Sequence, residues 1–157
     1  MKNSVNYESV ANYFISLSNE TGNLITNLKL QKLVYYTQAW ALAINNEKIF
    51  DSDFEAWVHG PVLRELYAKY KKFQWKPIDE NVGDSIEILA SMPEDVRSVV
   101  KEVTDEYFGL SAYELERLTH AEEPWIKARK GVEASELSRN IISKDSMRSY
   151  YGKLVRT

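Results

Sequence analysis

The sequence of 157 residues has the size of one domain, and we expect residues 1–157 to fold around a single hydrophobic core. Hydrophobic residues make up 44% of the chain and charged residues 27%, with a net charge of -3, which excludes intrinsic disorder and a strongly basic protein. Because the chain has no cysteine, a disulfide framework, a thiolate nucleophile and a cysteine zinc site are excluded.

The N-terminal residues carry no recognisable targeting signal. They lack the apolar stretch of a signal peptide, and nowhere does the sequence run for the roughly 18 apolar residues that a membrane-spanning helix requires. We therefore expect a cytoplasmic protein that does not contact a membrane.

Two helices are predicted at the start of the chain. The first, over about residues 4–19, has Val10, Phe14 and Leu17 on one face and ends at Gly22. The second begins after Thr26, whose side chain can cap it, and ends at residues 45–46. Apolar residues cover much of its circumference, so we expect it to be a buried core helix. These residues are Leu30, Leu33, Val34, Tyr36, Trp40, Ala41, Ala43 and Ile44.

A short two-stranded β-hairpin is predicted between the second and third long helices. Residues 49–50 and 54–58 are aromatic or β-branched, and Asp51 and Asp53 in the turn separate them. Gly60 should break the second strand, and Pro61 suits the first turn of a third helix because its missing N–H needs no partner there.

The second half of the chain is also predicted to be helical. Residues 76–91 form a loop with one helical turn at 85–89, and a helix with acidic residues in its first turn follows and stops at Gly109. Ser111 and Glu114 match a capping box at the start of the next helix. Pro124 begins another helix, and the last helix starts at Ser143. The sequence therefore predicts a mostly α fold of about seven helices and one hairpin.

Charge is divided unevenly along the chain. Residues 1–76 carry nine basic and seven acidic side chains, residues 77–126 three basic and thirteen acidic, and residues 127–157 eight basic and three acidic. One interpretation is a set of helices with solvated charged faces. The other is an acidic face that meets a basic partner, with electrostatics speeding the encounter.

Three sequence strings stand out together in the chain. The first string contains Leu30, Gln31, Lys32, Leu33, Tyr36 and Trp40, the second Glu55, Trp57, His59, Gly60, Pro61 and Val62, and the third Leu118, Thr119, His120, Pro124 and Trp125. In this order the strings resemble the Panacea domain family of SocA-like antitoxins and phage-associated proteins, and the resemblance covers about residues 8–151. We interpret these residues as mainly structural.

The resemblance implies a helical antitoxin that neutralises a protein toxin encoded in the same operon by direct contact. Domains similar to this one are paired with many unrelated toxins, so the family does not identify the partner. Some members act as adaptors that deliver the toxin to an ATP-dependent protease such as ClpXP, which is the main alternative. Others carry an added DNA-binding domain, for which this chain has no room.

Toxin contact is predicted at side chains near helix ends. Aromatic residues dominate both protein cores and binding hot spots, and the apolar helix and strand patterns assign Trp40 and Trp57 to the core. The candidate toxin-binding residues are Tyr70, Lys72, Trp75 and Tyr151. The sequence does not settle whether the chain forms a homo-oligomer.

No catalytic, metal or cofactor site is expected. His59 and His120 are better explained by turn and helix-end hydrogen bonds than by metal ligation, and Glu122 and Glu123 suit a helix N-terminus. The glycines are scattered and form no phosphate-binding loop. An enzyme that reverses the toxin's modification and a DNA-binding repressor therefore stay as weaker alternatives, the second because the acidic middle segment would repel phosphates.

Overall fold

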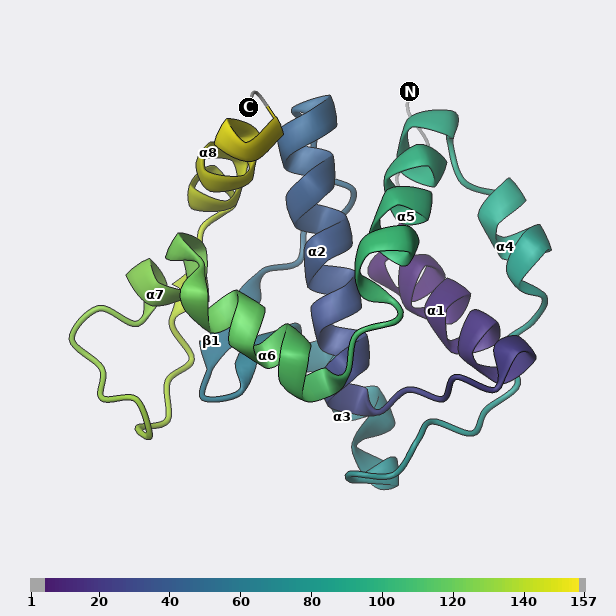
Figure 1. Ribbon diagram of the computed structural model, residues 1–157, viewed down its shortest axis with the longest axis horizontal. Coiled ribbons are helices and arrows are strands. Elements are labelled where there is room, and N and C mark those ends of the chain that lie inside the picture. The colour runs from purple at the N-terminus through teal and green to yellow at the C-terminus, as the bar shows by residue number, and fades with distance from the viewer. Residues whose placement is uncertain (1–4, 156–157) are drawn as a thin grey trace.

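The computed structural model describes residues 5–155, which fold around one hydrophobic core (Figure 1). Within these residues are eight α-helices, one 3-10 helix and three strands. In chain order they are α1 (Tyr7–Thr21), α2 (Asn27–Asn45), β1 (Phe54–Trp57), β2 (Gly60–Val62), α3 (Arg64–Tyr70), η1 (Lys71–Phe73), α4 (Ser85–Ala90), α5 (Glu94–Tyr107), α6 (Ala112–Ala121), α7 (Glu123–Ala128), β3 (Ile141–Ile142) and α8 (Lys144–Val155). The mostly α prediction is confirmed. The helical turn predicted at 85–89 is a helix of its own, α4, which is additional to the seven predicted helices.

Helix α2 is the centre of the fold. It lies between α8 on one side and α5 on the other, and every residue from 29 to 39 is buried (Figure 1). Thr26 caps its start by accepting a hydrogen bond from the Lys29 amide, and Asn46 ends it in a left-handed conformation. The prediction of a buried core helix between these caps is confirmed.

Amphipathic helices cover α2. In α5 the buried residues Val96, Val99, Val100 and Val103 repeat at helical spacing, while the intervening acidic residues face water. Helix α6 begins with the predicted capping box, in which Ser111 accepts from the Glu114 amide and the Glu114 carboxylate accepts from the Ser111 amide.

None of the helices within residues 5–155 is both long and apolar enough to cross a membrane.

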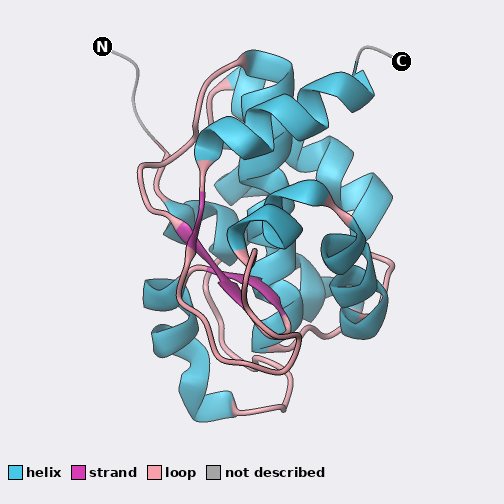
Figure 2. Cartoon of the chain, turned by 90° about the vertical axis from the view of Figure 1, so that its left-hand side faces the viewer, coloured by secondary structure: helices cyan, strands magenta, loops and turns pink. Residues whose placement is uncertain are grey.

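The sheet differs from the predicted hairpin. Its strand order is β2-β1-β3, all antiparallel, and Figure 2 shows the three short strands together among the helices. The hairpin pairs β1 with β2, so the predicted pairing of residues 49–50 with 54–58 is wrong. The third strand, which is only two residues long, gives no period-2 pattern in the sequence.

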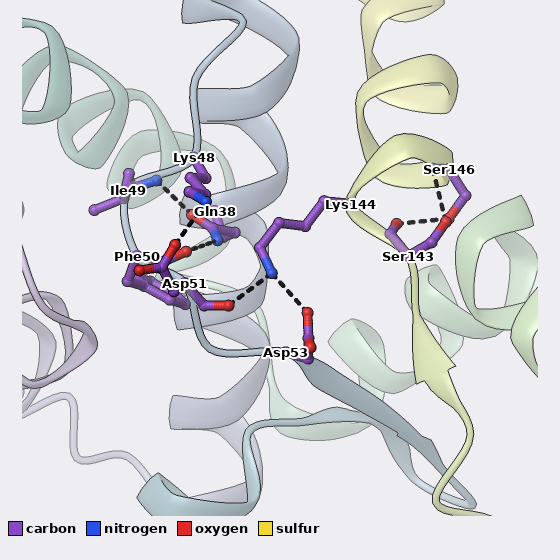
Figure 3. A network of polar contacts seen from close by, with 9 residues as sticks. All are labelled: Gln38, Lys48, Ile49, Phe50, Asp51, Asp53, Ser143, Lys144 and Ser146. Atoms are coloured by element: carbon purple, nitrogen blue, oxygen red, sulfur yellow. Dashed lines mark hydrogen bonds and ion pairs between the residues drawn. The ribbon is translucent and has the colours of Figure 1, made fainter.

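Gln38 explains why residues 49–50 form no strand. Its buried side chain accepts a hydrogen bond from the Ile49 amide at 2.7 Å and donates to the Phe50 carbonyl at 2.7 Å (Figure 3). These are the backbone groups that a partner strand would otherwise satisfy. The segment is therefore fixed to α2 through one amide side chain.

A lysine at the start of α8 fixes the next turn. Lys144 Nζ donates to the Asp51 carbonyl at 2.8 Å and to Asp53 Oδ1 at 2.6 Å, and Lys48 pairs with Asp51 (Figure 3). The two aspartates therefore hold the C-terminal helix and the turn before β1 together.

Gly60 and Pro61 lie in a strand and do not begin a helix. Gly60 has a φ of +118°, which favours glycine, and Pro61 is tolerated because β2 is an edge strand whose outer side needs no N–H donor. Helix α3 begins at Arg64, so the prediction that Gly60 breaks the strand and Pro61 starts the helix is wrong. A Gly-Pro pair is compatible both with a turn before a helix and with this edge strand, so the sequence pattern does not distinguish the two.

We predict that Gly60→Ala destabilises the protein by about 3 kcal/mol or more, because strain at positive φ adds to steric overlap. A Cβ atom at residue 60 would lie 2.9 Å from Lys32 Cε and 3.0 Å from Thr119 Oγ1. Gly22→Ala is the matched control, since Gly22 has a φ of +75° and nothing within 4 Å of the added atom. Chemical denaturation should give a loss of only about 1 kcal/mol there. Equal losses would contradict the tight packing at Gly60.

Candidate functional site

The second sequence string forms the β1–β2 hairpin, and residues of the first and third strings pack against its inner side. Gln31 on α2 is fully buried, and its Oε1 accepts a hydrogen bond from the Leu63 amide at 2.9 Å. Its Nε2 donates to Asn27 Oδ1 at 3.0 Å. Gln31 therefore fixes the chain where β2 passes into α3.

Lys32 lies directly beneath the hairpin. Its side chain is fully buried against Gly60 and Thr119, and among the described residues its Nζ has no hydrogen-bond partner. Burial lowers the pKa of Lys32 to about 8, and the nearby Glu116 carboxylate opposes this shift only in part. The absence of a side chain at Gly60 leaves the room that the lysine occupies.

His120 and Trp125 support the hairpin turn from α6 and α7. Their rings stack with centroids 4.0 Å apart, and Trp125 Nε1 donates to the Trp57 carbonyl at 2.8 Å. His120 hydrogen-bonds the Val58 backbone, while its Nε2 is buried without a partner within residues 5–155. Burial lowers the pKa of His120, so this residue is neutral at pH 7.

Arg129 joins β1 to the segment before β3. Its buried guanidinium donates to the carbonyls of Ala56 at 2.8 Å, Glu133 at 2.8 Å and Glu136 at 2.6 Å. It also lies over the Trp125 ring, 5.1 Å from the centroid. Three carbonyl oxygens thus take the place of a carboxylate partner, and the 130–138 loop is held against the hairpin.

A second polar cluster connects α2, α7 and α8. Glu122 Oε1 accepts from the Tyr36 hydroxyl at 2.8 Å and from the Tyr151 hydroxyl at 2.7 Å. Burial raises the pKa of Glu122 in spite of these two bonds. Trp40, predicted to be in the core, is partly buried and donates to the Tyr107 hydroxyl at 2.8 Å.

The remaining residues of the strings have simpler surroundings. Leu30 and Leu33 lie in the core, Pro124 is buried and Leu118 is partly exposed. Glu55 pairs with Arg64 at 3.0 Å and accepts from the Trp57 indole at 2.9 Å. His59 is exposed and contacts Glu116 at 2.9 Å, so the predicted hydrogen bond to the turn backbone is wrong. No group of three His, Asp or Glu side chains that could hold a metal ion occurs within residues 5–155.

The outer side of the hairpin lines a groove, which we call the hairpin groove. It consists of two adjoining hollows of about 410 Å³ and 340 Å³ that share Leu28 and Tyr67. The first is also lined by Trp57, Val58, His59, Val62, Leu137, Ser138 and Arg139, and the second by Thr26, Asn27, Gln74, Trp75 and Ala112. The second string thus supplies the side chains of Trp57, His59 and Val62 to the groove.

Two of the four candidate toxin-binding residues are not accessible. Tyr70 and Tyr151 were predicted to be free because they lie near helix ends, but both are buried, Tyr151 within the aromatic cluster of α2 and α8. Trp75 is 77% exposed and lies at one end of the hairpin groove, and Lys72 is exposed near it in sequence. Toxin contact by Lys72 and Trp75 stays a prediction.

Sequence reasoning missed the side chains that complete the groove. Tyr67 lies in the segment predicted to form the third helix, and Leu137 lies in a segment without periodicity. Leu137 is 89% exposed, more than any other large hydrophobic side chain within residues 5–155. An isolated leucine in a polar loop is a weak signal for a binding surface, and only the fold brings it to the hairpin.

We predict that Lys32→Met is more stable than the parent protein at pH 7 and that this difference shrinks by about 2 kcal/mol by pH 9.5. The folded-state pKa near 8 lies below the ordinary 10.5, so the unfolded state binds the extra proton between these values. Stability therefore rises with pH in this window, and the methionine variant lacks the rise. Urea unfolding at both pH values tests this, with the exposed Lys153→Met as control. A parallel pH profile for Lys32→Met and the parent would contradict a depressed pKa.

Comparisons with known proteins bear on the same residues. The family model described as "Antitoxin SocA-like, Panacea domain" matches residues 30–126, from α2 to α7. A curated relative, Antitoxin SocA of Caulobacter vibrioides (strain NA1000 / CB15N), is 28% identical over 130 residues, which cover 78% of this chain and 69% of that protein. No solved structure matches significantly.

Proposed function

We infer that this chain, which belongs to the SocA-like antitoxin family that carries the Panacea domain, neutralises a cognate protein toxin by binding it directly. We place it in the cytoplasm, beside a toxin encoded in the same operon. Direct contact requires an exposed surface that can be covered by a partner.

The hairpin groove is the observation that carries this proposal. Its walls combine aromatic and aliphatic side chains from the hairpin, α2, α3 and the 130–138 loop. Leu137 and Trp75 project at its two ends. Exposed aromatic and aliphatic anchors around a hollow are typical of the centre of a protein interface.

The hairpin is rigidly supported, which favours binding. Its backbone receives hydrogen bonds from Arg129 and Trp125, and Gln31 fixes the chain that leaves it. A preorganised surface loses little conformational entropy when a partner covers it. These side chains are therefore used, in this proposal, to hold a binding surface in place.

The hydrogen bonds around the hairpin favour a binding role over a catalytic role. Gln31, Trp125 and Arg129 each donate to or accept from backbone groups, so their polar atoms are occupied by the fold. Among the described residues of the three strings, the buried atoms without a partner are Lys32 Nζ and His120 Nε2, and neither residue lines the hairpin groove. General acid or base groups need to reach the substrate.

The cations near the groove suggest what the toxin offers at this surface. Lys72, Lys76 and Arg139 form no ion pair within the described residues, and Lys76 lies over the Trp75 ring. An apolar groove with such a rim fits a segment whose apolar side chains are flanked by acidic ones.

We predict that the double variant Trp75→Glu/Leu137→Glu binds the toxin about 100-fold more weakly, because it places charges where apolar anchors are buried. The product of the adjacent gene, as an inactive variant, serves as toxin in a pull-down followed by calorimetry. Ile86→Glu is the matched control, since Ile86 is 76% exposed on α4 and lines no part of the groove. Thermal unfolding should be unchanged in both variants.

Co-expression separates direct neutralisation from proteolytic delivery. Rescue of growth should persist in a host that lacks the protease and should fail with the double variant. Rescue only when the protease is present would assign the protein to the adaptor class. A double variant that binds and rescues like the parent protein would place the toxin on another surface.

A further inference from the structure

A second groove lies at the other end of α2, and we call it the α5 trough. It consists of two adjoining hollows of about 590 Å³ and 490 Å³ that share Ile44 and Glu102. The hairpin groove is lined by Leu28 near the start of α2, whereas the trough is lined by Trp40, Ile44 and Asn45 near its end. At 1.5 Å per residue, Leu28 and Ile44 lie about 24 Å apart along the helix.

The floor of the trough is apolar and fixed. It is formed by Trp40, Ile44, Val99, Val103, Tyr107 and Val155. Trp40 donates to the Tyr107 hydroxyl at 2.8 Å, and the Tyr107 ring stacks on the buried Tyr36 ring at 4.0 Å. The shape of this floor is therefore set before any partner arrives.

Two aliphatic side chains in the trough are open to water. Ile44 is 49% exposed and Val155 is 46% exposed, although each lies beside buried core residues. Because the neighbouring helices are already packed on α2, only a bound partner could cover these two side chains.

The rim of the trough is acidic. Glu94, Glu102 and Glu106 follow one face of α5 and form no ion pair or side-chain hydrogen bond within the described residues. No described lysine or arginine lines either hollow. Part of the acidic middle segment of the sequence is thus gathered around an apolar floor, and within residues 5–155 no ion pair neutralises these three carboxylates.

We propose that the α5 trough binds a basic amphipathic helix of a partner protein. Lining residues run along α5 from Glu94 to Tyr107, a length of about 20 Å, which matches roughly three to four turns of a docked helix. Apolar residues at i, i+4 and i+7 of such a helix would cover Ile44, Val103 and Val155. Its lysines and arginines would face Glu94, Glu102 and Glu106, as charge complementarity requires.

The observations select a protein helix over other occupants. Phosphate polymers would be repelled by the acidic rim. A segment that contacted only the acidic rim would leave the apolar floor exposed to water. The occupant therefore needs a basic side and an apolar side. This inference is independent of the hairpin groove, because the two surfaces share no lining residue.

Three designed 14-residue peptides test the proposal with the full chain. One is a helix with leucines at i, i+4, i+7 and i+11 and lysines on the opposite side; the second is a scrambled peptide of the same composition; the third has glutamates in place of the lysines. We expect binding of the first peptide by calorimetry, with at least tenfold weaker binding of the other two. Amide chemical shifts should change around Ile44, Glu102 and Val155.

Matched variants locate the site. Glu102→Lys/Glu106→Lys should weaken binding of the basic helix at least tenfold, and so should Ile44→Ser, which removes an apolar anchor without altering charge. Glu133→Lys/Glu136→Lys reverses two exposed acidic residues outside the trough and should change affinity less than twofold. Circular dichroism and thermal unfolding confirm that each variant is folded.

Several results would overturn the proposal. These are equal binding of the helical and scrambled peptides, shift changes centred outside the trough, or equal losses in the trough and control variants. Failure of the basic helix to bind would also reject it. None of these results depends on toxin binding at the hairpin groove, so the two proposals can fail separately. A complex with twice the mass of this chain that forms without peptide and is lost in the Glu102→Lys/Glu106→Lys variant would assign the trough to a second copy and overturn the proposal.

Discussion

The structure depends on the burial of α2 from residue 29 to residue 39, because the polar side chains in a helix segment with no solvent-facing side need partners within the protein. Gln31 binds the Leu63 amide, Gln38 binds both polar groups of the segment at Ile49 and Phe50, and Asn27 donates to the Tyr67 carbonyl. Each of these side chains fixes the backbone of a segment that follows later in the chain. The core helix therefore also determines where the hairpin, the turn before it and α3 lie.

The same helix gives the molecule two surfaces of different chemistry. Near its start it lies beneath a hairpin whose outer residues form an apolar groove, which Arg139 also lines and where Lys76 lies over the Trp75 ring. Near its end it contributes to a trough that is apolar below and acidic at the rim. The uneven distribution of charge along the sequence becomes a separation in space, since Glu94, Glu102 and Glu106 line the trough from α5, whereas Lys76 and Arg139 lie outside that helix.

What could be predicted from the sequence was local in origin. The caps at Thr26 and Ser111 and the buried stripe of α2 depend on neighbours within a few residues, and these predictions are confirmed. The strand assignment of residues 49–50 was wrong because their partner is a side chain eleven or twelve residues away. The position of Tyr151 was wrong because its burial depends on packing against α2, more than a hundred residues earlier. The hairpin groove could not be predicted at all, since Leu137 reaches it only through the folded 130–138 loop.

Arg129 holds that loop through hydrogen bonds to its backbone, which do not depend on the loop's own side chains. Its guanidinium donates to the carbonyl oxygens of Glu133 and Glu136, so the loop is held at these two positions through its backbone. Almost any residue can stand at these positions without loss of the anchoring bonds. The side chains of the loop are thereby released from structural constraint, and substitutions at Leu137 or Arg139 alter what the molecule presents while the scaffold stays intact. A fold built in this way can exchange one partner for another through a few loop mutations, without first losing stability.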